Sequence, residues 1–266
     1  METRSIKLVK RADHRSSDQI RSVCLSYNLL GYAESSVLYE QGETKILCSI
    51  SLQNKVPHFL KGKRVGWLNA EYAMLPCATK LRTNREINLS HRNARSVEIS
   101  RLIGRCLRTT VDLIALGERT IVVDCDVLQA DGGTRVACIT AASIALKQAC
   151  IKWHTELVTE KNIFKEPIAA ISAGIVDEIP YLDLSYSEDC NAVADFNFVI
   201  TKSKKLVEVQ GTAEKEAISW DDFELLKKMA IDGTTKLFET FDTIATTKIS
   251  GASIFSIGSR IKSRNE

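Results

Sequence analysis

The chain has 266 residues, of which 44 % are hydrophobic and 26 % charged, and its formal net charge is +3. These values are ordinary for a globular protein and exclude a collagen-like fibre, a coiled coil and a disordered chain. No apolar run approaches the ~18 residues that a membrane helix needs, and the first residues lack the apolar core of a secretory signal. We therefore expect a cytoplasmic protein with no membrane partner.

The eight cysteines form no Cys-x-x-Cys pair, and most lie in apolar runs. In the absence of an export signal, this usage indicates free thiols in a reducing compartment rather than a disulfide framework.

Positive charge is concentrated in one segment. Between residues 80 and 108, eight lysines and arginines stand against two glutamates, so this segment carries +6 and the rest of the chain −3. A focused basic segment favours a polyanionic partner. A basic helix face turned to solvent would show the same charge.

The first part of the chain predicts a hairpin over 36–52 and a basic loop over 54–66. Residues 76–94 lack periodicity and are rich in Asn, Thr and Arg, which predicts a long mobile loop. Apolar residues at three- and four-residue spacing then predict an amphipathic helix over 96–116, closed by Gly117.

The second part predicts a strand over 120–129 and a helix over 136–152 whose small residues call for close packing on several sides. Hairpins are expected over 168–186 and 194–210, and a final helix from about 219 to 247.

Hairpins and helices without a Pro/Ser-rich linker indicate an α+β fold, with two similar packed halves as one option. We expect one domain over 11–247 and a flexible, basic C-terminal tail over 248–266.

An anion site is expected where the predicted strand meets the small-residue helix, in the run Asp131-Gly132-Gly133-Thr134-Arg135. The glycines let the backbone approach an anion, and free N–H groups at the helix start point toward it. Thr134 adds a hydroxyl donor, and Arg135 adds a planar guanidinium suited to phosphate. A plain tight turn would explain the glycine pair alone.

Arg95 precedes the helix predicted to start at Ser96. A guanidinium there would reinforce the same anion site, although an ordinary surface arginine would look the same.

Asp189 and Asp195 stand six residues apart in an acidic stretch between two hairpins. Across a turn, both carboxylates can converge on one Mg²⁺ ion. Carboxylates in turns more often form or cap the turn, but Asp195 lies in the apolar run Val-Ala-Asp-Phe, where a charge needs a partner.

Other chemistries find little support. The four histidines show neither a His-x-His nor a His-Glu-x-x-His spacing, which argues against zinc, and a Gly-x-Ser-x-Gly elbow is absent. Aromatic residues make up only 6 %, so a nucleic acid would be held mainly through its phosphates.

Several longer motifs, in a fixed order, carry a resemblance to a known family. They are AEYAMLP (70–76), RSVEISRLIGR from Arg95, ALGER (115–119), DCDVLQADGGTR (124–135), Glu188-Asp189, Asp195 and VEVQGTAE (207–214). Over residues 11–245 the chain resembles the bacterial ribonuclease PH family.

The resemblance implies a fold of two similar β/α halves packed in one compact domain. It implies a tRNA nucleotidyltransferase, which is a phosphate-dependent 3′→5′ exoribonuclease. Such an enzyme trims 3′ ends of tRNA precursors, and of rRNA, and releases nucleoside diphosphates. It also implies a homohexameric ring, a trimer of dimers, that holds tRNA and other RNA 3′ ends.

The same resemblance assigns roles to residues of this chain. Arg95, Gly133, Thr134 and Arg135 would bind the phosphate co-substrate, and Asp189 and Asp195 would be catalytic and bind Mg²⁺. Positive charge for RNA would come from the nearby basic residues, which are Lys80, Arg82, Arg85 and Arg92.

Three positions depart from the family pattern. Cys77 stands where arginine is usual, the segment 87–94 lacks the small, Gly/Lys-rich pattern, and His14 replaces a glycine. The first two affect the details of RNA binding rather than the phosphate site.

Two alternatives remain open. One is a catalytically inactive, exosome-type ring subunit that binds RNA, which should lack part of the Gly-Gly-Thr-Arg or aspartate set that this chain keeps. The other is a Mg²⁺-dependent hydrolytic nuclease, which would release monophosphates and need no phosphate site.

Overall fold

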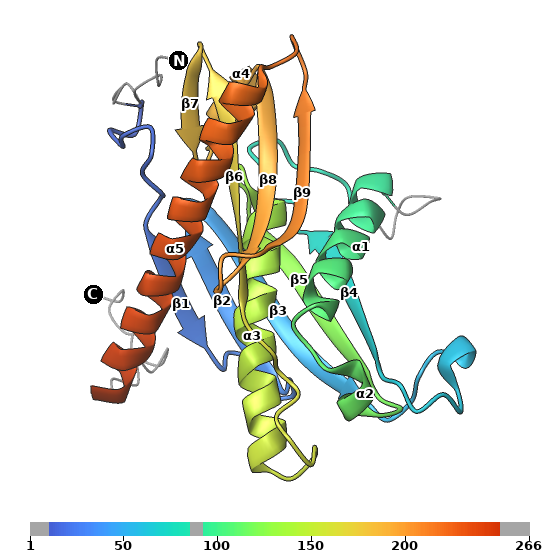
Figure 1. Ribbon diagram of the computed structural model, residues 1–266. Coiled ribbons are helices and arrows are strands. Elements are labelled where there is room, and N and C mark those ends of the chain that lie inside the picture. The colour runs from blue at the N-terminus through green and yellow to red at the C-terminus, as the bar shows by residue number, and fades with distance from the viewer. Residues whose placement is uncertain (1–10, 86–92, 251–266) are drawn as a thin grey trace, which may run out of the picture.

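The computed structural model of the protein describes residues 11–85 and 93–250. Two β-sheets form the body of the fold (Figure 1). The N-terminal sheet has the strand order β1-β2-β3-β5-β4, and only β4 and β5 run parallel. Its strands are β1 (Val23–Tyr27), β2 (Ser35–Gln41), β3 (Thr44–Gln53), β4 (Trp67–Met74) and β5 (Thr120–Gln129).

The C-terminal sheet is antiparallel, with the strand order β7-β6-β8-β9. Its strands are β6 (Ile168–Val176), β7 (Ile179–Leu182), β8 (Ala194–Thr201) and β9 (Leu206–Ala213). Every residue of β6 is buried, because α3 covers one face of this strand and α5 packs against it as well.

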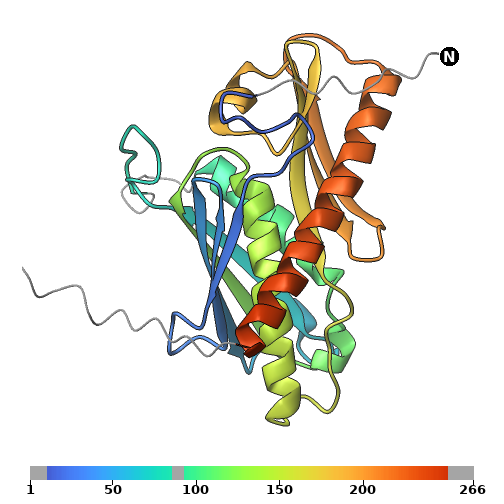
Figure 2. The same ribbon diagram turned by 90° about the vertical axis from the view of Figure 1, so that its left-hand side faces the viewer.

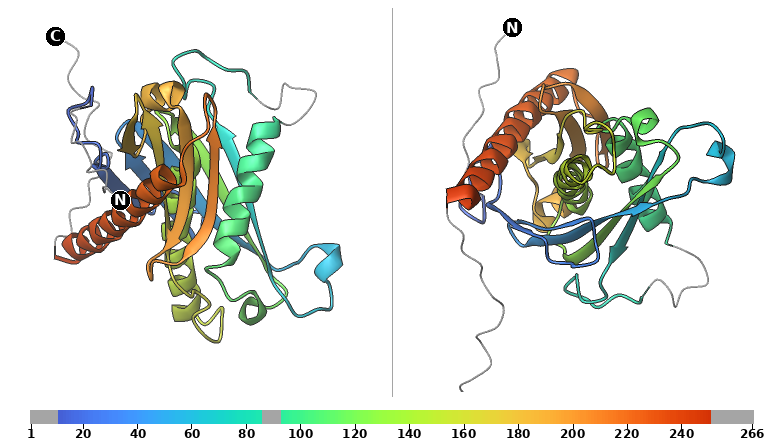
Figure 3. Two further views of the ribbon diagram at one scale, coloured as in Figure 1. Left: turned by 45° about the horizontal axis from the view of Figure 1, so that its top comes forward. Right: turned by 90° about the horizontal axis from the view of Figure 1, so that it is seen from below.

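The helices of the described part are α1 (Ala94–Arg108), α2 (Leu113–Leu116), α3 (Thr134–Thr155), α4 (Tyr186–Asn191) and α5 (Trp220–Ser250). A short 3₁₀ turn, η1 (His58–Leu60), lies in the basic loop, which extends away from the body (Figure 3).

Helix α3 lies between the two sheets, as its end-on view in Figure 3 shows. Its small residues are buried on several sides, as the sequence predicts, and its core cluster also contains side chains from both sheets. By length and composition α3 could cross a membrane, but 72 % of its most apolar window is buried inside the protein. This is the composition of a fully surrounded core helix.

The predicted α+β fold is confirmed, and its strands form two sheets. The hairpin expected over 36–52 is β2-β3, and those over 168–186 and 194–210 are β6-β7 and β8-β9. The strand over 120–129 is β5, and the helices near 136–152 and 219–247 are α3 and α5, each slightly longer than predicted.

The helix expected over 96–116 is broken between α1 and α2. The Asp112 carboxylate caps α2 by accepting hydrogen bonds from the N–H groups of Ile114 and Ala115, at 3.1 and 3.0 Å. Just before it, Val111 forms a β-bridge with Phe164. This long-range pairing is invisible in the apolar spacing, which continues across the break.

Strands β1 and β4 and helix α4 were not predicted. The tail was predicted to begin at 248, whereas α5 reaches Ser250, and the residues beyond 250 lie outside the described part.

Candidate active site

The glycine turn, residues 131–133, joins β5 to α3. Gly132 and Gly133 have φ angles of 73° and 65°, in the left-handed region that favours glycine. A Cβ atom on Gly132 would lie 2.6 Å from the carbonyl oxygen of Leu184 and 2.7 Å from the nitrogen of Tyr186. The turn therefore touches the backbone just before α4, and Figure 2 shows it beneath that helix.

Thr134 and Arg135 are the first two residues of α3. The buried Thr134 hydroxyl lies 3.2 Å from the hydroxyl of Tyr72 on β4. Arg135 donates from Nη2 to the Glu98 carboxylate at 2.9 Å, while its buried Nε has no hydrogen-bond partner within the described residues. This buried donor is therefore left unsatisfied by the described residues.

Arg95 is the second residue of α1, and its N–H donates to the capping side chain of Asn93 at 3.0 Å. Burial raises the pKa of the Tyr72 hydroxyl and of the Asp189 carboxylate, and the Arg95 guanidinium is close enough to both to oppose this rise. Burial nevertheless raises the pKa of Tyr72 to about 12, so this hydroxyl stays protonated as a hydrogen-bonding group. The fold therefore brings Arg95 to the start of α3.

Asp189 and Asp195, the acidic pair, come from the other half of the chain. Asp189 lies in α4, and Asp195 lies in β8 between Gly174 of β6 and Thr212 of β9. Helix α4 begins with a capping box at Ser185 and ends at Asn191, within the turn predicted between the two aspartates.

The acidic pair carries negative charge in an unfavourable environment. Partial burial raises the pKa of Asp189, Glu214 adds to this, and Arg95 and Arg135 oppose it. Burial also raises the pKa of Asp195, and repulsion by Asp189 and Glu214 acts in the same direction. Arg135 acts on both aspartates and Arg95 on Asp189, so the acidic pair lies near the arginines of the phosphate-binding prediction.

The donor set of the acidic pair fits Mg²⁺. No group of three or more His, Cys, Asp or Glu side chains within 11–85 and 93–250 is arranged to hold a metal ion. Mg²⁺, however, is usually bound by one or two carboxylates together with water and substrate phosphates. Two partly buried carboxylates that repel each other meet this requirement, so the magnesium assignment stays a prediction.

The basic residues Lys80, Arg82 and Arg85 are exposed in the segment that follows β4. The base of this segment is joined to the glycine turn, because the N–H of Ala130 donates to the carbonyl of Ala78 at 2.9 Å. Their RNA-binding role stays a prediction, and the fourth residue of this set, Arg92, lies outside the described residues.

The structure adds three side chains that sequence reasoning missed, namely Tyr72, Glu98 and Glu214. Tyr72 and Glu214 lie inside the quoted motifs AEYAMLP and VEVQGTAE, and Glu98 follows Arg95 by three residues, on the same side of a helix.

Comparison with known families covers most of the chain. The first domain of the ribonuclease PH type, described as "3′ exoribonuclease family, domain 1", matches residues 19–152, and domain 2 of that family matches residues 166–233. The chain belongs to this 3′ exoribonuclease family. The expected resemblance to ribonuclease PH is confirmed.

Solved structures with this 3′ exoribonuclease fold include exosome proteins. Rice (Oryza sativa) Rrp46 is 17 % identical with a TM-score of 0.71, covering 88 % of this chain and 99 % of that chain. An Archaeoglobus fulgidus exosome with RNA bound to the active site is 22 % identical with a TM-score of 0.73, covering 87 % and 92 %. An archaeal exosome core is 21 % identical with a TM-score of 0.70, covering 88 % and 91 %. At these identities the likeness concerns the fold.

Proposed function

We propose that the protein shortens RNA from its 3′ end with inorganic phosphate and releases nucleoside diphosphates. The observation that carries this proposal is the meeting of Arg95 and Arg135, at the starts of α1 and α3, with Asp189 and Asp195 from the C-terminal half. Positive groups suited to a phosphate thus face carboxylates suited to a cation.

The main obstacle to the reaction is bringing two anions together, so positioning and charge neutralisation dominate. Arg95, Arg135 and the N–H groups at the start of α3 would hold the attacking phosphate. Its oxygen forms a bond to the phosphorus of the last phosphodiester, and the bond to the 3′ oxygen of the preceding nucleotide breaks. That oxygen takes up the proton that the hydrogen phosphate gives up.

Asp189 and Asp195 would hold Mg²⁺. When bound, the ion neutralises charge on the reacting phosphodiester and on the leaving oxygen. The chain would contribute two hard oxygen ligands, one from α4 and one from β8, which are close enough for Asp189 to repel Asp195.

A second candidate is a catalytically inactive, exosome-type ring subunit that binds RNA. The likeness to rice Rrp46 and to two archaeal exosome structures favours it over a tRNA-processing enzyme. The side chains of the site favour an active protein, since a subunit that only holds RNA does not need this phosphate site. Both candidates share RNA as partner and a ring as assembly, and a cytoplasmic homohexamer acting on tRNA precursors is the form we propose for the active one.

One assay separates the candidates. RNA labelled in its 3′-terminal phosphodiester is incubated with the full-length protein and Mg²⁺, with and without inorganic phosphate. Phosphate-dependent release of labelled diphosphate supports phosphorolysis, and phosphate-independent monophosphate would indicate a hydrolytic nuclease. RNA binding without release of either product would indicate the inactive subunit.

Arg135→Ala should reduce phosphate-dependent release about 10²- to 10³-fold, by analogy with removal of one preorganised donor for a reacting anion. RNA binding should change little, because this side chain belongs to the phosphate site. Arg101→Ala, an exposed arginine of α1, is the control and should leave the rate unchanged. Normal phosphorolysis by Arg135→Ala contradicts the assigned role.

Asp189→Asn tests the acidic pair. The change keeps the shape of the side chain and removes a charge that repels Asp195, so the melting temperature should stay equal or rise. Phosphorolysis should fall by orders of magnitude if the carboxylate binds Mg²⁺. A destabilised variant with near-normal specific activity would show that Asp189 is only structural.

A further inference from the structure

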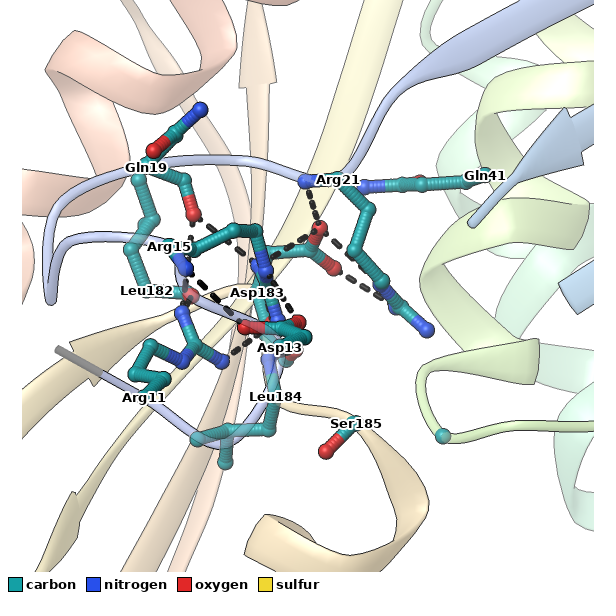
Figure 4. A network of polar contacts seen from close by, with 12 residues as sticks. Arg11, Asp13, Arg15, Gln19, Arg21, Gln41, Leu182, Asp183, Leu184 and Ser185 are labelled. Carbon is teal, nitrogen blue, oxygen red and sulfur yellow. Dashed lines mark hydrogen bonds and ion pairs between the residues drawn. The ribbon is translucent and has the colours of Figure 1, made fainter. Parts of the chain in front are cut away.

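A buried ion pair joins the N-terminal segment to the C-terminal half. Arg21 and Asp183 are 6 % and 0 % exposed, and Figure 4 shows the Arg21 side chain directed at the Asp183 carboxylate. Arg21 donates from Nη2 to Oδ1 at 2.6 Å, from Nε to Oδ2 at 3.1 Å, and from its backbone N–H to Oδ2 at 2.7 Å. This bidentate pair fixes the orientation of the guanidinium.

The same guanidinium reaches the glycine turn. Arg21 donates from Nη1 to the carbonyl oxygen of Asp131 at 2.5 Å. Its Nη2 lies 3.3 Å from the position that a Cβ atom on Gly133 would take. Arg21 therefore holds both the glycine turn and Asp183. Asp183 comes one residue before the backbone that this turn touches.

Thr44 gives the turn a second anchor. Its buried hydroxyl donates to the carbonyl oxygen of Gly132 at 2.8 Å and accepts from the N–H of Asp131 at 3.1 Å. Arg21 and Thr44 thus hold the two successive carbonyl oxygens of the turn, leaving the N–H groups at the start of α3 directed at the proposed phosphate site.

A parallel set of contacts fixes α4, which carries Asp189. Arg11 donates to the carbonyl oxygens of Leu182 and Asp183 at 2.6 and 2.9 Å, and it pairs through two nitrogens with the Glu188 carboxylate. Glu188 in turn accepts from the N–H of Ser185 at 2.8 Å in the capping box of α4. The backbone around Asp183 is therefore held from both sides.

We propose that Arg21, with Asp183 and Thr44, is a positioning element that sets the separation between the glycine turn and the acidic pair. This inference rests on the proposed phosphorolysis, in which phosphate lies at the turn and the reacting phosphodiester lies at the acidic pair. None of the three residues touches the reactants. They fix the geometry between two sites on different halves of the chain, and misplacement of reacting groups by about 1 Å can lower a rate about 10²-fold.

The test measures kcat and KM for phosphate in three variants. Arg21→Lys keeps the charge beside Asp183, but an ammonium cannot bind both that carboxylate and the Asp131 carbonyl in the present geometry. Thr44→Val keeps the side-chain shape and removes the hydroxyl, whereas Thr44→Ser keeps the hydroxyl. We expect kcat to fall about 10- to 100-fold in Arg21→Lys and in Thr44→Val. Their KM for phosphate should stay within about threefold of the original value. Thr44→Ser should retain the original kcat.

Arg119→Lys is the control for stability. Arg119 also donates to a carbonyl oxygen, that of Val158 at 2.6 Å, but it lies at the far end of β5 from the glycine turn. The kcat of Arg119→Lys should stay unchanged at temperatures well below its melting temperature, even if that melting temperature falls as much as in Arg21→Lys. Should Arg21→Lys not fold, the Thr44 pair gives the same comparison.

The outcomes separate the two proposals. If the original protein shows no phosphate-dependent release, the proposed function is wrong and this inference is wrong with it. If the original protein is active and kcat is unchanged in Arg21→Lys or Thr44→Val, the positioning role alone is wrong. A raised KM for phosphate with unchanged kcat would likewise overturn it, because the contacts would then shape the phosphate site rather than its distance from the acidic pair.

Discussion

Replacing Gly132 by alanine should lower stability and activity together, and the structure sets the size of the effect. A left-handed φ of 73° costs an alanine about 1 kcal/mol. The added methyl group would also lie 2.6 Å from the carbonyl oxygen of Leu184, in backbone that cannot move as a flexible side chain could. Overpacking of this kind adds about 2 kcal/mol, which brings the total to about 3 kcal/mol. For a chain of this size, we expect the melting temperature to fall by about 6–12 °C.

Gly62 provides the matched control, because it has a φ of 80° and no atom within 4 Å of a Cβ position. Gly62→Ala should therefore show only the conformational cost of about 1 kcal/mol, or about 2–4 °C in melting temperature. Thermal unfolding and phosphate-dependent RNA release are measured on both variants. Equal melting temperatures for the two would refute the close contact of the glycine turn with α4, and normal release by Gly132→Ala would refute its importance for the site.

Three further outcomes are expected. Asp124→Asn should stabilise the protein by about 1 kcal/mol at pH 7, as measured by denaturant titration. Burial and neighbouring carboxylates raise the Asp124 pKa from 3.8 to about 6, and solvent screening leaves only part of that shift as a loss of stability. An unchanged stability would mean that this carboxylate is well solvated. Burial alone would raise the pKa values of Asp183 and Glu188, but their arginine partners hold both below the ordinary 3.8 and 4.5. Their contribution is therefore complete above these values and is lost as the pH falls through the folded pKa, so the melting temperature should drop below about pH 4, and a flat profile there would contradict the ion pairs. Charge reversal at Arg82 and Arg85 should weaken tRNA binding and flatten its salt dependence, because each arginine that no longer neutralises a phosphate lowers the slope for a duplex by about 0.9; equally weakened binding of a very short oligonucleotide would indicate a folding defect instead.

The local parts of the site could be predicted from the sequence, because each depends on neighbouring residues. Two left-handed glycines before α3, an arginine at the start of the earlier helix α1 and an aspartate in an apolar strand are visible in short windows. The α4 helix was missed, although Ser185 and Glu188 form the spacing of a capping box, because six residues show no apolar period.

The parts that could not be predicted depend on contacts between distant residues. Arg21 and Asp183 are 162 positions apart, and nothing in the periodicity of either segment pairs them. Strand β4 alternates buried and exposed residues, but Asn69, Ala70 and Glu71 in its centre weaken its β propensity, and parallel pairing with β5 completes it. Tertiary pairing also ends α1 early, at the bridge between Val111 and Phe164.

The electrostatics of the site favour an active protein over one that only holds RNA. Partial burial raises the pKa of Asp189 and of Asp195, and repulsion adds to this, from Glu214 on both and from Asp189 on Asp195, so at neutral pH these charges oppose folding. Arg135 likewise keeps a buried Nε without a partner inside the described residues. RNA binding by Lys80, Arg82 and Arg85 needs none of these features, since exposed lysines and arginines contact phosphates without any cost of burial. An anion bound by Arg95 and Arg135 and a cation bound by the acidic pair would compensate the charges that gather at this site. Phosphorolysis is the proposed function that brings these two ions together here.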